Sequence, residues 1–219
     1  MRKLVILRPE PGASTSAERA RELGLDVAVC PLFAVQPIAW NPPDPAEYDA
    51  LLLTSTNTVR HGGAGLAKLV GLPVLAVGEA TAAAARAVGF TVTSVGTEGA
   101  GALLDAPGPR RRLLHLTGKH HADLPSRHDI ATVITYHAAA LPDPALPDVA
   151  NMVLAVHSPR AGARLAELVT NRSTTIVAAI SEAAAMACGA GWQAVEWVEQ
   201  PSDSALLALA ARLCQSPVR

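Results

Sequence analysis

The sequence has no excess of charge of either sign, with 18 Lys and Arg residues against 19 Asp and Glu residues in a chain of 219. A formal net charge of −1 and a pI near 6.6 give no broad positive field that would attract nucleic acid or an anionic lipid surface. We therefore expect neither nucleic acid nor a membrane among its partners. An anionic ligand would have to be held by local groups.

Long hydrophobic runs are also missing. The apolar stretches after Asp49 and Asn151 end within a few residues, whereas a helix that spans a bilayer needs about 20. The charged start, Met1-Arg2-Lys3, is followed by apolar residues only as far as Pro9, too few for the core of a signal peptide. We expect a chain with no transmembrane span and no export signal, located in the cytoplasm.

Cysteine is scarce, and the three residues Cys30, Cys188 and Cys214 show no CxxC spacing. An odd number of scattered cysteines favours buried, reduced thiols over a disulfide framework or a zinc site. His115, His120, His121 and His128 fit no regular metal-ligand spacing either. Nor does the chain contain a Walker loop, HExxH or GxSxG, or a GxGxxG after its first apolar run. We expect no metal site.

Short β-branched runs alternate with Ala-rich stretches of helical period. The first unit predicts a strand over 3–8, a helix over 14–24 and a strand over 26–30, with Ser14 or Ser16 as the helix cap and Gly24 at its end. Strands separated by helices require crossover connections, so the fold class is α/β with mainly parallel sheets. Further strands are expected at 50–54, 74–77, 90–95, 113–117, 132–136, 152–156, 175–179 and 192–198.

Two proline-rich segments, about 33–45 and 132–148, interrupt this alternation. Proline disfavours helices and central strands, so each segment is expected to begin as a strand and to end as a semi-rigid connector. The alternative is a pair of ordinary surface loops. The connector interpretation predicts that the chain crosses twice between two parts of the molecule.

An internal repeat favours the connectors. Ser55 aligns with Ser158 and Glu79 with Glu182, each pair 103 residues apart, and similar residues surround all four. The repeat predicts two similar α/β lobes. One is discontinuous, residues 1–35 plus 146–219, and the other is the middle lobe, 36–145. A ligand cleft is expected between them.

Polar residues follow the repeated strands. Ser55 and Ser158 each come directly after a strand and open a helix, where capping is the ordinary role of a hydroxyl. Ligands of parallel sheets also bind at this edge, where helix N-termini attract anions. Tyr136, predicted to end a strand at the second connector, could donate a hydrogen bond there. Its alternative role is to cover the hinge with an amphipathic ring.

The order of these blocks resembles the uroporphyrinogen-III synthase family over nearly the whole chain. The blocks are Arg8-Pro9, Thr54–Val59, Val77–Ala82, Tyr136, Ser158-Pro159 and Pro201-Ser202. The resemblance implies an enzyme of heme biosynthesis without a metal or organic cofactor. It would close linear hydroxymethylbilane, with loss of water and inversion of ring D, to give uroporphyrinogen III. It also suggests a transient contact with the deaminase that precedes it in this biosynthesis.

The resemblance assigns roles to several residues. Tyr136 matches the family tyrosine that assists departure of the hydroxyl group, while Ser55, Thr81 and Ser158 match hydroxyls that contact substrate. We add Arg8, Arg60 and Lys119 as local positive charges near strand ends, with solvent exposure as their alternative role.

Two departures from the family pattern concern substrate affinity. Ala184 replaces the threonine expected opposite Thr81, and the segment 119–129, interrupted by Pro125, leaves little room for a helix. The rival hypothesis is a non-catalytic two-lobed module that binds an anionic small molecule or a tetrapyrrole without converting it.

Overall fold

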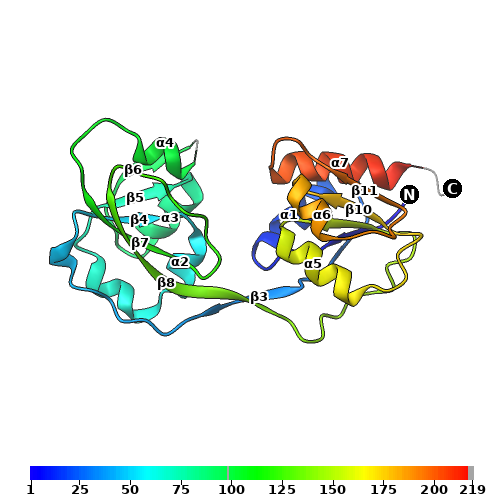
Figure 1. Cartoon of the computed structure of the whole chain (residues 1–219), viewed down its shortest axis with the longest axis horizontal. Coiled ribbons are helices and arrows are strands. Elements are labelled where there is room, and N and C mark those ends of the chain that lie inside the picture. Colours follow the sequence, from blue (N-terminus) through cyan, green and yellow to red (C-terminus); the bar gives the residue numbers. More distant parts are fainter. Residues whose placement is uncertain (98, 217–219) are drawn as a thin grey trace. The chain divides into compact units, whose positions relative to one another are not determined.

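The computed structural model describes residues 1–97 and 99–216 and divides the chain into two compact units. Lobe 1 consists of Met1–Ala34 and Ala139–Arg219, and lobe 2 consists of Val35–Ala138. The predicted pair of α/β lobes is confirmed (Figure 1). Within the described ranges, every helix is too short or too polar to cross a bilayer.

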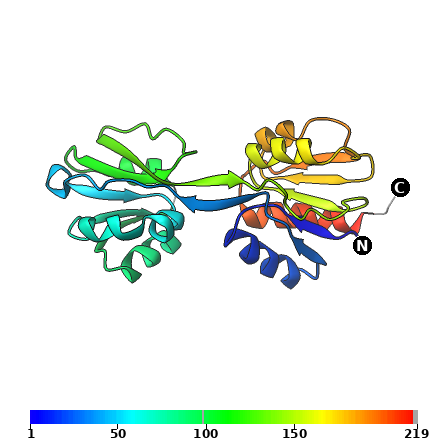
Figure 2. The same cartoon turned by 90° about the horizontal axis from the view of Figure 1, so that it is seen from below.

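Lobe 1 is a five-stranded sheet in the order β11-β10-β9-β1-β2, and all its pairings are parallel. Its strands are β1 (Leu4–Ile6), β2 (Val27–Val29), β9 (Val153–Val156), β10 (Ile176–Ala179) and β11 (Ala194–Trp197). Its helices are α1 (Gly12–Glu22), α5 (Pro159–Leu168), α6 (Glu182–Ala187) and α7 (Asp203–Gln215). Helices α1 and α7 cover one face of the sheet, and α5 and α6 cover the other (Figure 2).

Lobe 2 is a six-stranded sheet in the order β3-β8-β7-β4-β5-β6, parallel from β8 to β6. Its strands are β3 (Phe33–Pro37), β4 (Ala50–Leu53), β5 (Val74–Val77), β6 (Val92–Gly96), β7 (Arg112–Gly118) and β8 (Asp129–Ala140). Its α-helices are α2 (Thr56–His61), α3 (Glu79–Ala87) and α4 (Ala100–Leu104). Its 3-10 helices are η1 (Pro45–Glu47) and η2 (Gly63–Leu69).

Both faces of each sheet are buried, and this explains the uninterrupted apolar runs of the central strands. In lobe 2, Leu51 and Leu53 point to the core under η2 and α3, while Leu52 points to the opposite core beside α4. All three leucines have 0% exposure. A strand buried on both faces shows no alternation of polar and apolar residues, as expected for a parallel sheet.

The two lobes have the same spatial order of strands, although the chain enters that order at a different strand in each lobe. The order 2-1-3-4-5 of a flavodoxin-like sheet corresponds to β2-β1-β9-β10-β11 in lobe 1 and to β8-β7-β4-β5-β6 in lobe 2. The direction of winding therefore reverses between β1 and β9 in lobe 1, and between β7 and β4 in lobe 2. Ligands of such sheets bind beyond the carboxyl ends of the strands at this point.

The lobes differ in what connects the first two strands of that order. In lobe 1, α1 connects β1 with β2 and packs Ala13, Ala17 and Ala20 into the core. In lobe 2, the segment 119–128 between β7 and β8 contains no helix. An irregular segment, short and interrupted by proline, therefore stands where lobe 1 has a helix.

The connectors are strands over part of their length. The N–H of Leu141 donates to the carbonyl of Leu32 at 2.9 Å, and the N–H of Ile38 donates to Thr135 at 2.9 Å, so the two segments run antiparallel. The prediction that Tyr136 ends a strand is wrong, because β8 continues to Ala140. Small alanines after Tyr136 remain compatible with an extended chain, and the strand ends just before Pro142.

The predicted cap of the first helix is also wrong. The helix begins at Gly12 with Pro11 as its N-cap residue, so Ser14 lies inside the first turn. Glu10 replaces a serine cap, because its carboxylate accepts the Ser14 N–H at 3.0 Å and the Ser14 hydroxyl at 2.9 Å. Ser16 is fully buried and bonds to a distant carboxylate.

Candidate functional site

The carboxyl ends of β4 and β9 place the two repeated serines at helix N-termini. Ser55 accepts the backbone N–H of Asn57 at 3.2 Å, and Ser158 accepts that of Ala161 at 3.2 Å. Both serines have extended backbones and are half-buried. Each therefore caps its helix, the ordinary role, and stands at the reversal point of its lobe.

Tyr136 lies in a slot formed by two residues of lobe 2. A Cβ atom placed on Gly118 would lie 2.5 Å from Cε2 of the Tyr136 ring, so only glycine allows the ring to lie over this backbone. On another side, the ring of His61 lies 6.2 Å from that of Tyr136, tilted by 39°. Among the described residues the Tyr136 hydroxyl has no hydrogen-bond partner. The ring thus packs against the Gly118 backbone with His61 near it, and the half-buried Tyr136 keeps a hydroxyl that no described residue engages.

Gly118 and His61 were not predicted from the sequence as neighbours of Tyr136. Gly118 pairs with Tyr136 at a break in the register between β7 and β8, which no single-strand pattern reveals. His61 ends α2, the helix that Ser55 opens. Burial, together with the charge of Arg60, lowers the pKa of His61. His61 is therefore a neutral imidazole beside the phenol at neutral pH.

The other predicted residues of lobe 2 differ in accessibility. Lys119 is exposed directly after β7, and its N–H donates to the carbonyl of Tyr136 at 2.9 Å. Arg60 is exposed and donates to the Thr56 hydroxyl at 3.0 Å. Thr81 is only 4% exposed, on the first turn of α3, so its hydroxyl is largely shielded from a ligand. Its counterpart in lobe 1, Ala184, is fully buried.

A second polar group lies under the irregular segment of lobe 2. His115 of β7 is 2% exposed, and its Nε2 lies 3.1 Å from the hydroxyl of Thr54. Burial, with the nearby His121 as a smaller cause, lowers the pKa of His115 to about 4. A pocket of about 320 Å³ is lined by His115, His121, Thr132 and residues of this segment. It occupies the place that α1 fills in lobe 1.

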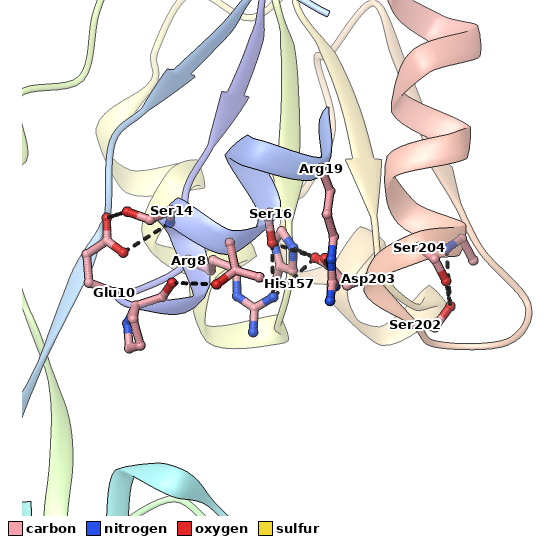
Figure 3. Close-up of polar contacts among 12 residues, drawn as sticks. Arg8, Glu10, Ser14, Ser16, Arg19, His157, Ser202, Asp203 and Ser204 are labelled. Carbon is pink, nitrogen blue, oxygen red and sulfur yellow. Dashed lines mark hydrogen bonds and ion pairs between the residues drawn. The ribbon is translucent and has the colours of Figure 1, made fainter. Parts of the chain in front are cut away.

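Lobe 1 carries a charged cluster at its reversal point, formed around the carboxylate of Asp203 (Figure 3). Its Oδ1 accepts the Ser16 hydroxyl at 2.6 Å, lies 3.0 Å from Nε2 of His157 and pairs with Nη1 of Arg8 at 3.1 Å. Its Oδ2 pairs with Arg19 at 3.1 Å. The His157 hydrogen bond, then Ser16 and Arg8, hold the pKa of Asp203 well below its usual range, against the opposing effect of burial.

The described residues contain no group of three His, Cys, Asp or Glu side chains placed to hold a metal ion. Cys30, Cys188 and Cys214 are all buried and unpaired. Burial raises the pKa of Cys188 and of Cys214 to about 11, so both are neutral thiols at neutral pH. What the strand ends offer is hydroxyls, a phenol, an imidazole and arginines.

These features define a class: a two-lobed α/β protein whose lobes share one parallel strand order and carry hydrogen-bond donors and cations at the strand ends. The sequence matches the family model described as uroporphyrinogen-III synthase HemD over residues 14–208. The chain belongs to the uroporphyrinogen-III synthase family.

Solved structures show the same fold. The uroporphyrinogen-III synthetase from Helicobacter pylori aligns with a TM-score of 0.69 at 19% identity, over 97% of this chain and 100% of the other. A mutant uroporphyrinogen III synthase from Thermus thermophilus aligns with a TM-score of 0.50 at 17% identity, over 97% and 99% of the two chains. No curated protein sequence matches the chain.

Proposed function

We infer that the protein is a uroporphyrinogen-III synthase, a cyclising lyase of heme biosynthesis. It closes linear hydroxymethylbilane with loss of water and inversion of ring D to give uroporphyrinogen III. The observation that carries this conclusion is the family match across residues 14–208. No finding favours the alternative, a two-lobed module that binds without converting.

Tyr136 is the residue we propose for the step that starts the reaction. Its hydroxyl has no partner among the described residues, while Gly118 and His61 fix the ring. The phenol would donate a proton to the terminal hydroxyl of the substrate, which leaves as water and generates an azafulvenium-like cation. The proton lost when the rearranged macrocycle regains its aromatic pyrroles restores the phenol, so no net proton is consumed.

The remaining work is positioning rather than activation. The cation reacts at the substituted carbon of ring D, and the spiro intermediate then fragments and recloses. Without guidance the same end closes directly to the type I isomer, so the protein must bind the substrate in the folded geometry. Ser55, Ser158 and the helices that they open stand at strand ends, where partial positive charge favours the substrate's carboxylates.

Cation side chains complete the proposed contacts. Lys119 is exposed directly after β7, Arg60 is exposed in the last turn of α2, and Arg8 lies two residues after β1 in lobe 1. Thr81 would need a local movement of α3 before it could touch substrate, because it is almost fully buried.

We propose that the enzyme acts in the cytoplasm and needs no metal or organic cofactor. The three buried, unpaired cysteines support a reducing compartment. Since hydroxymethylbilane closes spontaneously, a transient contact with the deaminase that makes it would limit its loss. Nucleic acid is not an expected partner.

The test is the isomer composition of the product. Purified protein is mixed with freshly generated hydroxymethylbilane, and the oxidised products are separated by chromatography. We expect mainly the type III isomer, in an amount that rises with protein concentration. Type I alone, at the rate of the reaction without protein, would reject the function. Tight binding with only type I product would instead favour the binding module.

A further inference from the structure

Arg8 lies two residues after the carboxyl end of β1, where contacts from α1 and α7 hold it. Its Nη1 donates to the Ser16 hydroxyl of α1 at 3.2 Å and to Asp203 of α7 at 3.1 Å. The Arg8 side chain is 34% exposed and the Asp203 side chain 16%. The guanidinium is therefore held at one nitrogen, and part of the Arg8 side chain is exposed.

Gly12, the first residue of α1, lies close against the guanidinium of Arg8. A Cβ atom on Gly12 would lie 2.6 Å from Nε, 2.8 Å from Cζ and 2.8 Å from Nη2 of Arg8. These distances place Gly12 above the guanidinium plane, on the side of Nε and Nη2. The N–H bonds of Nε and Nη2 lie in the plane itself.

Nε and Nη2 form one of the two forks with which a guanidinium binds a carboxylate through two parallel hydrogen bonds. Neither nitrogen has a hydrogen-bond partner in residues 1–97 or 99–216. Neither is a fully buried atom left unsatisfied. At the reversal point of lobe 1 the structure thus leaves one fork of the Arg8 guanidinium without a partner among the described residues, while Nη1 is held by Ser16 and Asp203.

We propose that this Nε and Nη2 fork of Arg8 binds one carboxylate of the substrate, and that Asp203 is the positioning residue that holds Arg8 for it. The proposal deepens the proposed function, on which it rests. It adds Asp203, Ser16 and Gly12 as residues that act through Arg8.

Asp203 suits this positioning role because it is itself immobilised. Besides Arg8, it accepts hydrogen bonds from Ser16 and His157 and pairs with Arg19, and it stands in the first turn of α7. A carboxylate at a helix N-terminus with several donors stays ionised. It can therefore hold Arg8 by charge without being displaced by a second carboxylate.

The experiment measures steady-state kinetics with hydroxymethylbilane in Arg8→Lys, Asp203→Asn and Gly12→Ala. Lysine keeps the charge but lacks the fork, and alanine at position 12 pushes the guanidinium from its place. We expect KM to rise by about tenfold in each variant with kcat nearly unchanged, because a contact made equally in ground and transition states affects only binding. Arg212→Gln, which breaks an exposed pair with Glu196 in the same lobe, is the matched control and should leave KM unchanged.

The double variant Arg8→Lys with Asp203→Asn distinguishes positioning from a merely structural role. If Asp203 acts through Arg8, adding Asp203→Asn to Arg8→Lys changes KM little further. Effects on KM that multiply would assign Asp203 a separate role and overturn its part of the proposal. An unchanged KM in folded Arg8→Lys would overturn the subsite.

A binding measurement separates this proposal from the proposed function. Uroporphyrin III, which carries the carboxylates of the product, is titrated against each variant by quenching of tryptophan fluorescence. We expect about tenfold weaker binding to Arg8→Lys than to the wild type and to Arg212→Gln. Equal binding overturns the subsite even if the wild type makes the type III isomer. Weaker binding supports it even if the wild type makes only type I.

Discussion

The two lobes have one strand order but different chemistry at corresponding places. Strand pairing makes Val27 of lobe 1 the counterpart of Ile130 of lobe 2, so six residues further along Phe33 corresponds to Tyr136. Phe33 is 7% exposed, with the Arg160 guanidinium 4.7 Å above its ring. Tyr136 is half-buried, and its hydroxyl has no partner in residues 1–97 and 99–216. Of these two corresponding rings, the one in lobe 2 carries the hydroxyl that we propose as the proton donor, and the one in lobe 1 carries none.

Charged side chains, in contrast, gather at the strand ends of lobe 1. Lobe 1 gathers Arg8, Arg19 and His157 around Asp203 at its strand ends, while the corresponding part of lobe 2 has the neutral pair Thr54 and His115. We propose that lobe 2 provides the chemistry and that lobe 1 provides charge that holds the substrate. The predictions below test this division.

The largest expected effect is that of Tyr136→Phe, which gives lobe 2 the ring found in lobe 1. Loss of the general acid should lower kcat by about tenfold or more. Stability to denaturant should not change, since the hydroxyl has no partner among the described residues. Kinetics with hydroxymethylbilane measures the effect. The matched control is Tyr48→Phe, because Tyr48 is the other tyrosine and lies under Arg112. A kcat equal to that of the control would remove the role of Tyr136.

Two glycines test whether close packing serves the same purpose in both lobes. A Cβ on Gly162 of lobe 1 would lie 2.6 Å from the carbonyl oxygen of Ala184, and one on Gly118 would meet Tyr136. Each alanine variant should cost about 1–3 kcal/mol of unfolding free energy. Only Gly118→Ala should also lower kcat, because only it displaces the phenol.

Denaturant unfolding together with kinetics separates these two effects. Gly101→Ala is the control, since a Cβ there meets nothing within 4 Å and alanine favours the helix. Equal loss of kcat in Gly118→Ala and Gly162→Ala would contradict the division between the lobes.

Acid should destabilise the lobes in different pH ranges. His115 has a folded pKa of about 4, below its ordinary 6.5, so the unfolded chain binds an extra proton between these values and stability falls as pH drops through that range. The loss should be about 2 kcal/mol in lobe 2. The folded pKa of Asp203 is also lowered, so its contribution is intact above the ordinary carboxyl pKa and is lost only at lower pH.

Tryptophan fluorescence can follow the lobes separately. Trp40 lies in lobe 2, and Trp192 and Trp197 lie in lobe 1. In one variant only Trp40 is kept, and in another only Trp192 and Trp197. Denaturant titrations at several pH values should show the His115 range in the first variant and the Asp203 range in the second. His115→Gln should flatten only the response of lobe 2. The same acid response in both lobes would show that neither group dominates it.

The smallest expected effect comes from the two helix caps. Ser55→Ala and Ser158→Ala should each cost about 1 kcal/mol of stability, since each hydroxyl accepts one backbone N–H. A rise in KM in one of these variants, in addition to the loss of stability, would identify the serine that also touches substrate. Thermal unfolding and kinetics on the same preparations decide between the two roles, and Ser181→Ala, a cap on α6, is the control.

Much of the fold could be predicted because local patterns carry it. Leu51–Leu53 is apolar without alternation, as a strand buried on both faces requires, and the repeat of Ser55 at Ser158 indicates the second lobe. The extension of β8 to Ala140 was missed because alanine has little preference for strands, and pairing with β3 decides it.

The candidate site was predictable only where a motif marked it. Arg8 and Asp203 stand 195 positions apart, so no sequence window connects them. The role of Gly118 follows only from its contact with the Tyr136 ring in the folded structure. The proximity of His61 to that ring depends on where α2 ends. Contacts between distant elements follow from tertiary packing, which periodicity does not encode.

The proposed division of work between the lobes can be tested in steady-state kinetics with the double variant Tyr136→Phe with Arg8→Lys. We expect kcat to fall as in the first single variant and KM to rise as in the second, so that the losses in kcat/KM multiply. If either single variant changed both parameters alike, or if the double variant were no worse than one of them, the division would be contradicted.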